Sequence, residues 1–100
     1  MVKSKDEAIL AIESLDLSMI NTKLRLQNKW SKRKADVIEM WYRRFLSIRI
    51  KYPGASIVPN EFIDAFWHEH ILNTQKYAKD CGKIGQFLHH NPSYNVEEDN

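Results

Sequence analysis

Apolar residues recur at helical spacing in three separate stretches of the chain. In the first stretch, residues 8–15 carry apolar side chains three or four positions apart, directly after Ser4 and Glu7, which fit a capping box. This pattern predicts a helix over residues 5–14. Residues 16–30 are ambiguous, because their apolar positions fit either a helix or a short strand.

The second stretch predicts a longer helix that begins after Ser31, a good N-cap, and ends near Lys51. Helical angles are disfavoured directly before Pro53, and Gly54 favours a turn, so residues 53–59 should form a loop. We expect this helix to contribute one stripe of apolar side chains to the core. The stripe steps by three and four residues through Ile38, Trp41, Phe45, Ile48 and Tyr52.

The third stretch predicts a helix that begins after Asn60 and runs to about Asp80, with Gly82 supplying the turn that ends it. Residues 83–90 show no clear period, and residues 93–100 form a polar, acidic segment that is expected to be a flexible tail. The pattern therefore predicts an all-α fold. We expect residues 1–92 to form a single small domain of three to four helices.

Length, charge and composition limit the classes of protein to which this chain can belong. A chain of 100 residues can form one modest core, and a net charge of +2 is too small to indicate nucleic-acid binding by bulk electrostatics. No segment approaches the roughly 20 apolar residues that a membrane span requires. The lone Cys81 cannot form an internal disulfide, so we expect a reducing compartment and a cytoplasmic protein.

Candidate chemistry gathers near the C-terminus, where all 4 histidines and the only cysteine lie between His68 and His90. Imidazole, thiolate and carboxylate are the groups that bind transition metals and transfer protons near neutral pH. Asp64 and His68 are four residues apart and can meet on one helical face, whereas His68 and His70 point about 160° apart.

A metal site built on Asp64 and His68 needs a further ligand from His89 or His90. In one subunit this requires a nearly extended return of the chain after Gly82, and a homodimer would relax the constraint. These ligand types suit Zn(II) and Fe(II) equally. The pair of Asp64 and His68 also fits an oriented general base or a simple surface pair.

A structural interpretation competes with the metal site. A histidine on an apolar helix face, such as His70, is more often buried and hydrogen-bonded than a ligand. Trp67 and Tyr77 lie on the same face and fit core aromatics whose polar tips find partners. Cys81 fits a small buried residue, because no base lies beside it in the sequence.

These residues also belong to a longer pattern, Asp64-x-x-Trp67-His68-x-His70, then Tyr77-x-x-x-Cys81 and His89-His90-x-Pro92. Over residues 17–92 the chain resembles short bacterial and phage-type members of the glycine-rich domain-containing protein-like family. The resemblance assigns no reaction. It implies that the motif positions are Asp64, His68, His70, Tyr77, Cys81, His89 and His90.

Three functions follow as hypotheses. The first is a small metal-binding protein, hydrolytic or oxygen-dependent, in which His70, Tyr77 and Cys81 support the ligands. The second is a non-catalytic protein–protein interaction module with a structural histidine motif, for which Trp30 is the leading surface anchor. The third is nucleic-acid binding through residues 32–34, where a solvated basic turn is the favoured interpretation.

Overall fold

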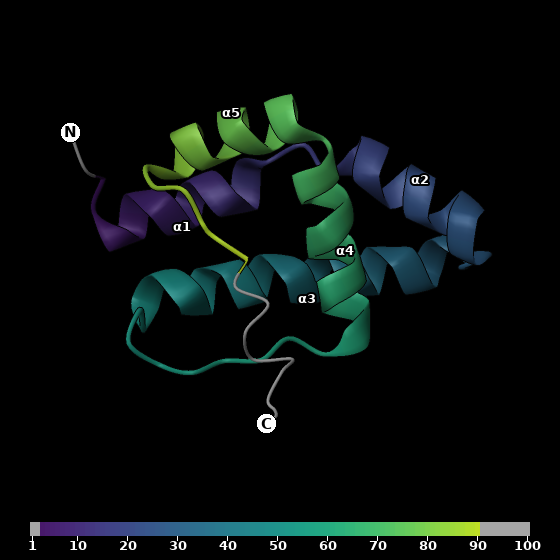
Figure 1. The fold of residues 1–100 in the computed structure, drawn as a ribbon, viewed down its shortest axis with the longest axis horizontal. Coiled ribbons are helices and arrows are strands. Elements are labelled where there is room, and N and C mark those ends of the chain that lie inside the picture. The colour runs from purple at the N-terminus through teal and green to yellow at the C-terminus, as the bar shows by residue number, and fades with distance from the viewer. Residues whose placement is uncertain (1–2, 91–100) are drawn as a thin grey trace, which may run out of the picture.

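The computed structural model describes residues 3–90, and within this range the chain forms helices and no strand. The prediction of an all-α fold is confirmed, with five helices in place of three or four (Figure 1). The predicted acidic tail, residues 93–100, lies outside the described residues. The helices are α1 Lys5–Ser14, α2 Ser18–Asn28, α3 Lys32–Lys51, α4 Glu61–Leu72 and α5 Thr74–Ile84.

Local capping signals explain where the helices begin. The Ser4 hydroxyl accepts a hydrogen bond from the Glu7 amide at 3.1 Å, and the Glu7 carboxylate accepts from the Ser4 amide at 2.9 Å, which completes the expected capping box. Ser31 and Asn60 cap α3 and α4 through their side-chain oxygens. The ambiguous residues 16–30 form α2, which ends at Lys29 in a left-handed conformation.

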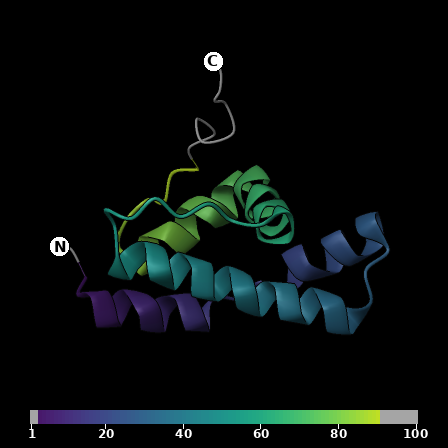
Figure 2. The same cartoon turned by 90° about the horizontal axis from the view of Figure 1, so that it is seen from below.

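Helix α3 is the central element and contacts α1, α2 and α4, whereas α5 packs on α1 and α4 (Figures 1 and 2). After α5 the chain turns at Gly85, whose φ of 101° favours glycine. Residues 86–90 then run back across the molecule, away from the end of α5 (Figure 1). No helix within residues 3–90 combines the length and apolar character that crossing a bilayer demands.

The predicted core stripe of α3 is wrong in part. Ile38 and Phe45 are buried, but Trp41, Ile48 and Tyr52 keep 37%, 40% and 60% of their surface exposed. Helix α3 carries two apolar stripes, and the one that faces the core includes Tyr42, which reaches a buried polar partner described below. The observed core stripe consists of Ala35, Ile38, Tyr42, Phe45, Leu46 and Ile50.

Candidate functional site

The predicted helix from Asn60 to Asp80 is interrupted at Asn73, which separates α4 from α5. The Asn73 side chain donates a hydrogen bond to the Glu69 carbonyl at 2.8 Å, and its φ and ψ of −85° and 72° are not helical. Asparagine competes in this way for helix backbone groups. Because of the break, α5 folds back and brings Tyr77 and Asp80 against His70.

His70 lies at the centre of a buried polar network and is 1% exposed. Its Nδ1 lies 2.7 Å from the Tyr42 hydroxyl, and its Nε2 lies 2.8 Å from Asp80 Oδ2. Lys76 Nζ reaches the same Asp80 oxygen at 3.0 Å. The prediction that His70 is buried and hydrogen-bonded is therefore confirmed.

Burial fixes the protonation pattern of this network. Burial lowers the pKa of His70 below its usual 6.5, although the hydrogen bond with Asp80 opposes the effect. Burial raises the pKa of the Tyr42 hydroxyl well above its usual value, so this group stays protonated and donates to His70 Nδ1. The neutral imidazole then donates its Nε2–H to Asp80, and every polar atom of the ring has a partner.

A second buried chain of hydrogen bonds connects α4, α5 and the returning segment. Trp67 Nε1 donates to the Tyr77 hydroxyl at 2.9 Å, and that hydroxyl donates to the Leu88 carbonyl. Both aromatic residues are buried, as predicted for core aromatics with satisfied polar tips. This connection holds residues 86–90 in place across α4.

The returning segment places His90 beside Asp64. His90 Nε2 lies 2.6 Å from Asp64 Oδ1, and the imidazole packs on Trp67 with ring centroids 4.4 Å apart. The chain achieves this with α5 extending to Ile84, and the extended return begins only after Gly85. Asp64 and His90 are thus the two candidate ligands that the fold brings together.

The remaining candidate ligands have different surroundings. His68 is exposed, and His89 is also exposed, with its ring against Phe87. Cys81 is buried, and burial raises the pKa of its thiol, which keeps the sulfur protonated and poorly nucleophilic. Across residues 3–90, no three His, Cys, Asp or Glu side chains are grouped so as to hold a metal ion.

Comparison with protein families gives one assignment. A family model described as UCP032817-like matches residues 7–100. The chain belongs to the UCP032817-like family. Curated proteins and solved structures gave no match. The resemblance to the glycine-rich domain-containing protein-like family stays a prediction.

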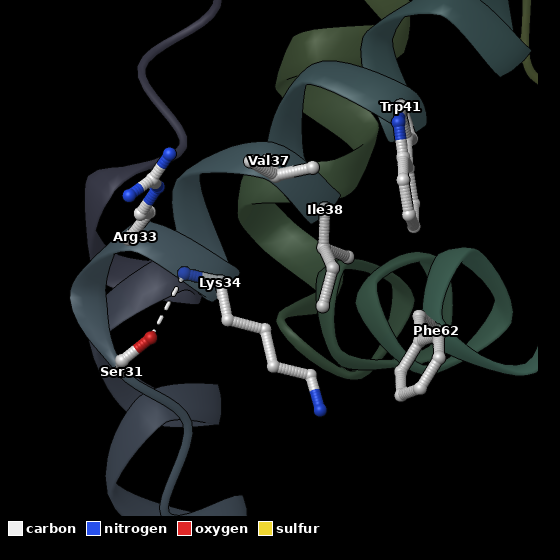
Figure 3. Close-up of a pocket in the computed structure, with 7 residues that line it drawn as sticks. All are labelled: Ser31, Arg33, Lys34, Val37, Ile38, Trp41 and Phe62. Atoms are coloured by element: carbon white, nitrogen blue, oxygen red, sulfur yellow. Dashed lines mark hydrogen bonds between the residues drawn. The ribbon is translucent and has the colours of Figure 1, made fainter.

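In this UCP032817-like protein a shallow apolar groove lies between α3 and the start of α4, where the core stripe of α3 meets its exposed side. It has a volume of about 310 Å³, and Ile38, Trp41 and Phe62 form its apolar wall (Figure 3). The Lys34 side chain runs along the groove, with its Nζ 4.6 Å from the Phe62 ring centroid (Figure 3). Trp30, the predicted surface anchor, is half-buried behind this wall and packs on Phe62.

Sequence reasoning missed Tyr42 and Asp80 as partners of His70. Tyr42 lies 28 residues before His70, and Asp80 reaches it only because α4 ends at Leu72. One signal was available: Asn73 is a poor helix former in the middle of the predicted helix. The groove was missed because the apolar stripe containing Trp41 was assigned to the core.

Proposed function

We propose that this UCP032817-like protein is a non-catalytic protein-interaction module, and that its binding surface is the side of α3 that faces away from the core. We define the outer face of α3 as an arc of about 120° on the helix. It contains four apolar and four basic side chains: Arg33, Lys34, Val37, Met40, Trp41, Arg44, Ile48 and Lys51.

The observation that carries this proposal is the exposure of large apolar side chains on that face. Seven of its eight residues are exposed and Val37 is half-buried, and the groove deepens the face beside Trp41. Trp, Met and Arg are enriched at protein interfaces, and rimmed apolar patches on a surface commonly mark them. A groove of this kind can receive a side chain from a partner.

The histidine motif has a structural role in this proposal. The network around His70 connects α3, α4 and α5, and Trp67 and Tyr77 fix the returning segment. Both networks are buried, so their atoms are not positioned to meet a substrate. The His70 network fixes α3 relative to α4 and α5, and a helix held in place loses little conformational entropy when its outer face binds.

Site-specific cross-linking in cells tests the proposal. A photoreactive phenylalanine derivative is placed at Met40 on the outer face, or at Leu10, an exposed apolar residue of α1, as the matched control. We expect a discrete cross-linked protein from position 40 and none from position 10. Capture at both positions equally, or at neither, would contradict the proposal.

Metal binding is a second candidate, and the 2.6 Å approach of His90 Nε2 to Asp64 Oδ1 is the observation that favours it. A Zn(II) or Fe(II) ion would take the place of the hydrogen-bonding proton only after these two atoms separate to about 3.3 Å, as metal–ligand bonds of about 2.0–2.1 Å require. A second subunit would have to supply further ligands, such as its own His68 or His89. Elemental analysis of untagged protein tests this candidate. It predicts about one metal per chain, lost on His90→Ala, whereas metal far below one equivalent contradicts it.

A further inference from the structure

Helix α3 carries a large excess of positive charge. The helix carries seven basic and two acidic side chains. Both acidic side chains are already paired with basic residues outside the defined face: Asp36, which borders the face beside Arg33 and Val37, with Lys32 at 2.8 Å, and Glu39 with Arg43 at 2.8 Å. Asn21 of α2 donates a further hydrogen bond to each of these carboxylates. The outer face therefore presents four basic groups, and the one carboxylate at its edge, that of Asp36, is already paired with Lys32.

The basic groups of the outer face have no acidic counterpart in the described part of the chain. Within residues 3–90, no ion pair involves Arg33, Lys34, Arg44 or Lys51. Lys34 instead places its ammonium over the rings of Phe62 and Trp30. The ammonium of Lys34 thus lies at the rim of the groove. A partner that inserts an apolar side chain into the groove could place a neighbouring carboxylate against this ammonium.

The shape of the face suits a helix. Arg33 and Lys51 are 18 positions apart, which corresponds to about 27 Å along a helix axis. Val37 and then Met40 or Trp41 fall on successive turns, Arg44 occupies the next turn, and Ile48 the turn after it. An apolar stripe of another helix can pack along these positions. The groove beside Trp41 provides a recess for one larger side chain.

We infer that the outer face of α3 binds an acidic amphipathic helix whose apolar stripe includes one aromatic or leucine side chain that enters the groove. This inference rests on the proposed function and specifies the chemistry of the partner. Complementary charge gives such a complex its specificity and a fast association rate, and the apolar stripe supplies most of its affinity.

Three synthetic probes test the inference on the full-length protein. Each is a helix of about 18 residues with the same Leu and Trp stripe, and its remaining positions are rich in Glu, Gln or Lys. Fluorescence anisotropy of labelled probes measures affinity, and amide and indole NMR shifts locate the site. We expect the Glu probe to bind about tenfold more tightly than the Gln probe, to weaken as salt rises, and to shift Val37 and the Trp41 indole.

Charge reversal provides the matched controls. Arg33→Glu combined with Arg44→Glu should weaken the Glu probe about tenfold or more and should favour the Lys probe. Lys79→Glu combined with Lys83→Glu makes the same change in net charge on exposed positions of α5 and should change the affinity less than about twofold. Equal weakening by both double variants overturns the inference, because net charge alone would then explain binding.

The other outcomes separate the inference from the proposed function. If the Gln and Lys probes bind the outer face as tightly as the Glu probe, the acidic partner is wrong and the interaction module stands. If no probe binds while the cross-linker at Met40 captures a protein, the acidic partner is again wrong and the interaction module again stands. If no probe binds and the cross-linker captures nothing, the inference and the proposed function both fail. If a single-stranded oligonucleotide binds the protein more tightly than the Glu probe does, the partner of the outer face is a nucleic acid and not an acidic helix.

The chain also contains an acidic segment of its own, residues 94–99, which carries Tyr94, Val96 and three carboxylates. Neutralising them by Glu97→Gln, Glu98→Gln and Asp99→Asn should leave the affinity for the Glu probe within about twofold. An increase of about tenfold would show that this segment competes for the outer face, and would overturn the assignment to a separate partner.

Discussion

In most proteins apolar side chains lie inside and polar side chains outside, and two regions of this molecule show the reverse. Around His70, polar side chains lie inside the protein, and each finds a partner: Tyr42 and Asp80 satisfy the two ring nitrogens of the imidazole, and Lys76 pairs with Asp80. On the outer face of α3, apolar side chains such as Met40 and Trp41 lie outside among basic groups. Buried polar networks position helices, whereas exposed apolar residues become useful only when another molecule covers them.

The two regions therefore predict opposite responses to mutation. A change in the buried network should lower the free energy of unfolding, and a change on the outer face should lower binding with little effect on stability. The following predictions test this contrast from the largest expected effect on stability to the smallest.

Asp80→Ala should have the largest effect. It leaves the Nε2–H of His70 and the ammonium of Lys76 without their buried acceptor. We expect the free energy of unfolding in urea to fall by about 3 kcal/mol. Asp6→Ala, at an exposed position of α1, is the control and should cost less than about 1 kcal/mol. A smaller loss for Asp80→Ala than for the control would show that the network contributes nothing.

Tyr77→Phe should have an intermediate effect, because it removes only the hydroxyl that joins Trp67 to the Leu88 carbonyl. The expected loss is about 2 kcal/mol, with faster hydrogen exchange at the Trp67 indole. Tyr52→Phe removes a hydroxyl from an exposed tyrosine and should change stability by less than about 0.5 kcal/mol. Equal effects of the two substitutions would contradict a role for the buried link.

Stability should also depend on pH through His70. Its pKa is lowered in the folded state by burial, so below pH 6.5 the unfolded chain takes up a proton that the folded chain does not. Stability should therefore fall as the pH drops from 6.5, by at most about 1.4 kcal/mol per pH unit. Urea denaturation between about pH 5 and pH 7.5 measures this slope.

The slope should disappear in His70→Gln and persist in His68→Gln, because His68 is exposed. A slope that is unchanged in His70→Gln would assign the pH dependence to another group. Carboxylates with lowered pKa values, such as Glu7, lose their contribution only near or below their usual value of 4.5, outside this window.

Met40→Glu should have the smallest effect on stability. Glutamate is a good helix former and the position is exposed, so unfolding should change by less than about 0.5 kcal/mol. Binding of the Glu-rich probe should fall more than about tenfold, because a carboxylate enters a basic and apolar face. Leu10→Glu makes the same kind of change on α1 and should leave binding intact. Loss of binding in both variants would contradict the location of the site.

Local signals predicted much of the fold. Ser4 with Glu7, Ser31 and Asn60 act on amides within their own first turn, so their caps follow from neighbouring residues alone. The break at Asn73 did not follow in this way. At the break the Asn73 amide still donates to the Glu69 and His70 carbonyls, and the side chains of His70 and Asp80 join α4 to α5. Such tertiary contacts are not visible in a periodic pattern.

The candidate site was only partly predictable for the same reason. The approach of His90 to Asp64 depends on the turn at Gly85 and on the Tyr77 bond to Leu88, which no spacing encodes. On α3, the stripe through Trp41 and the stripe through Tyr42 are both apolar at helical spacing. The hydrogen bond between Tyr42 and buried His70 belongs to the stripe that faces the core, and this tertiary contact is not visible in the spacing.

The most direct test of the account measures unfolding and binding together in Tyr77→Phe and Met40→Glu. We expect Tyr77→Phe to lose about 2 kcal/mol of stability and to bind the Glu-rich probe with unchanged affinity wherever it remains folded. We expect Met40→Glu to keep its stability and to lose the probe. If both variants lose stability and binding in parallel, the division between a histidine-based scaffold and a binding face on α3 is wrong.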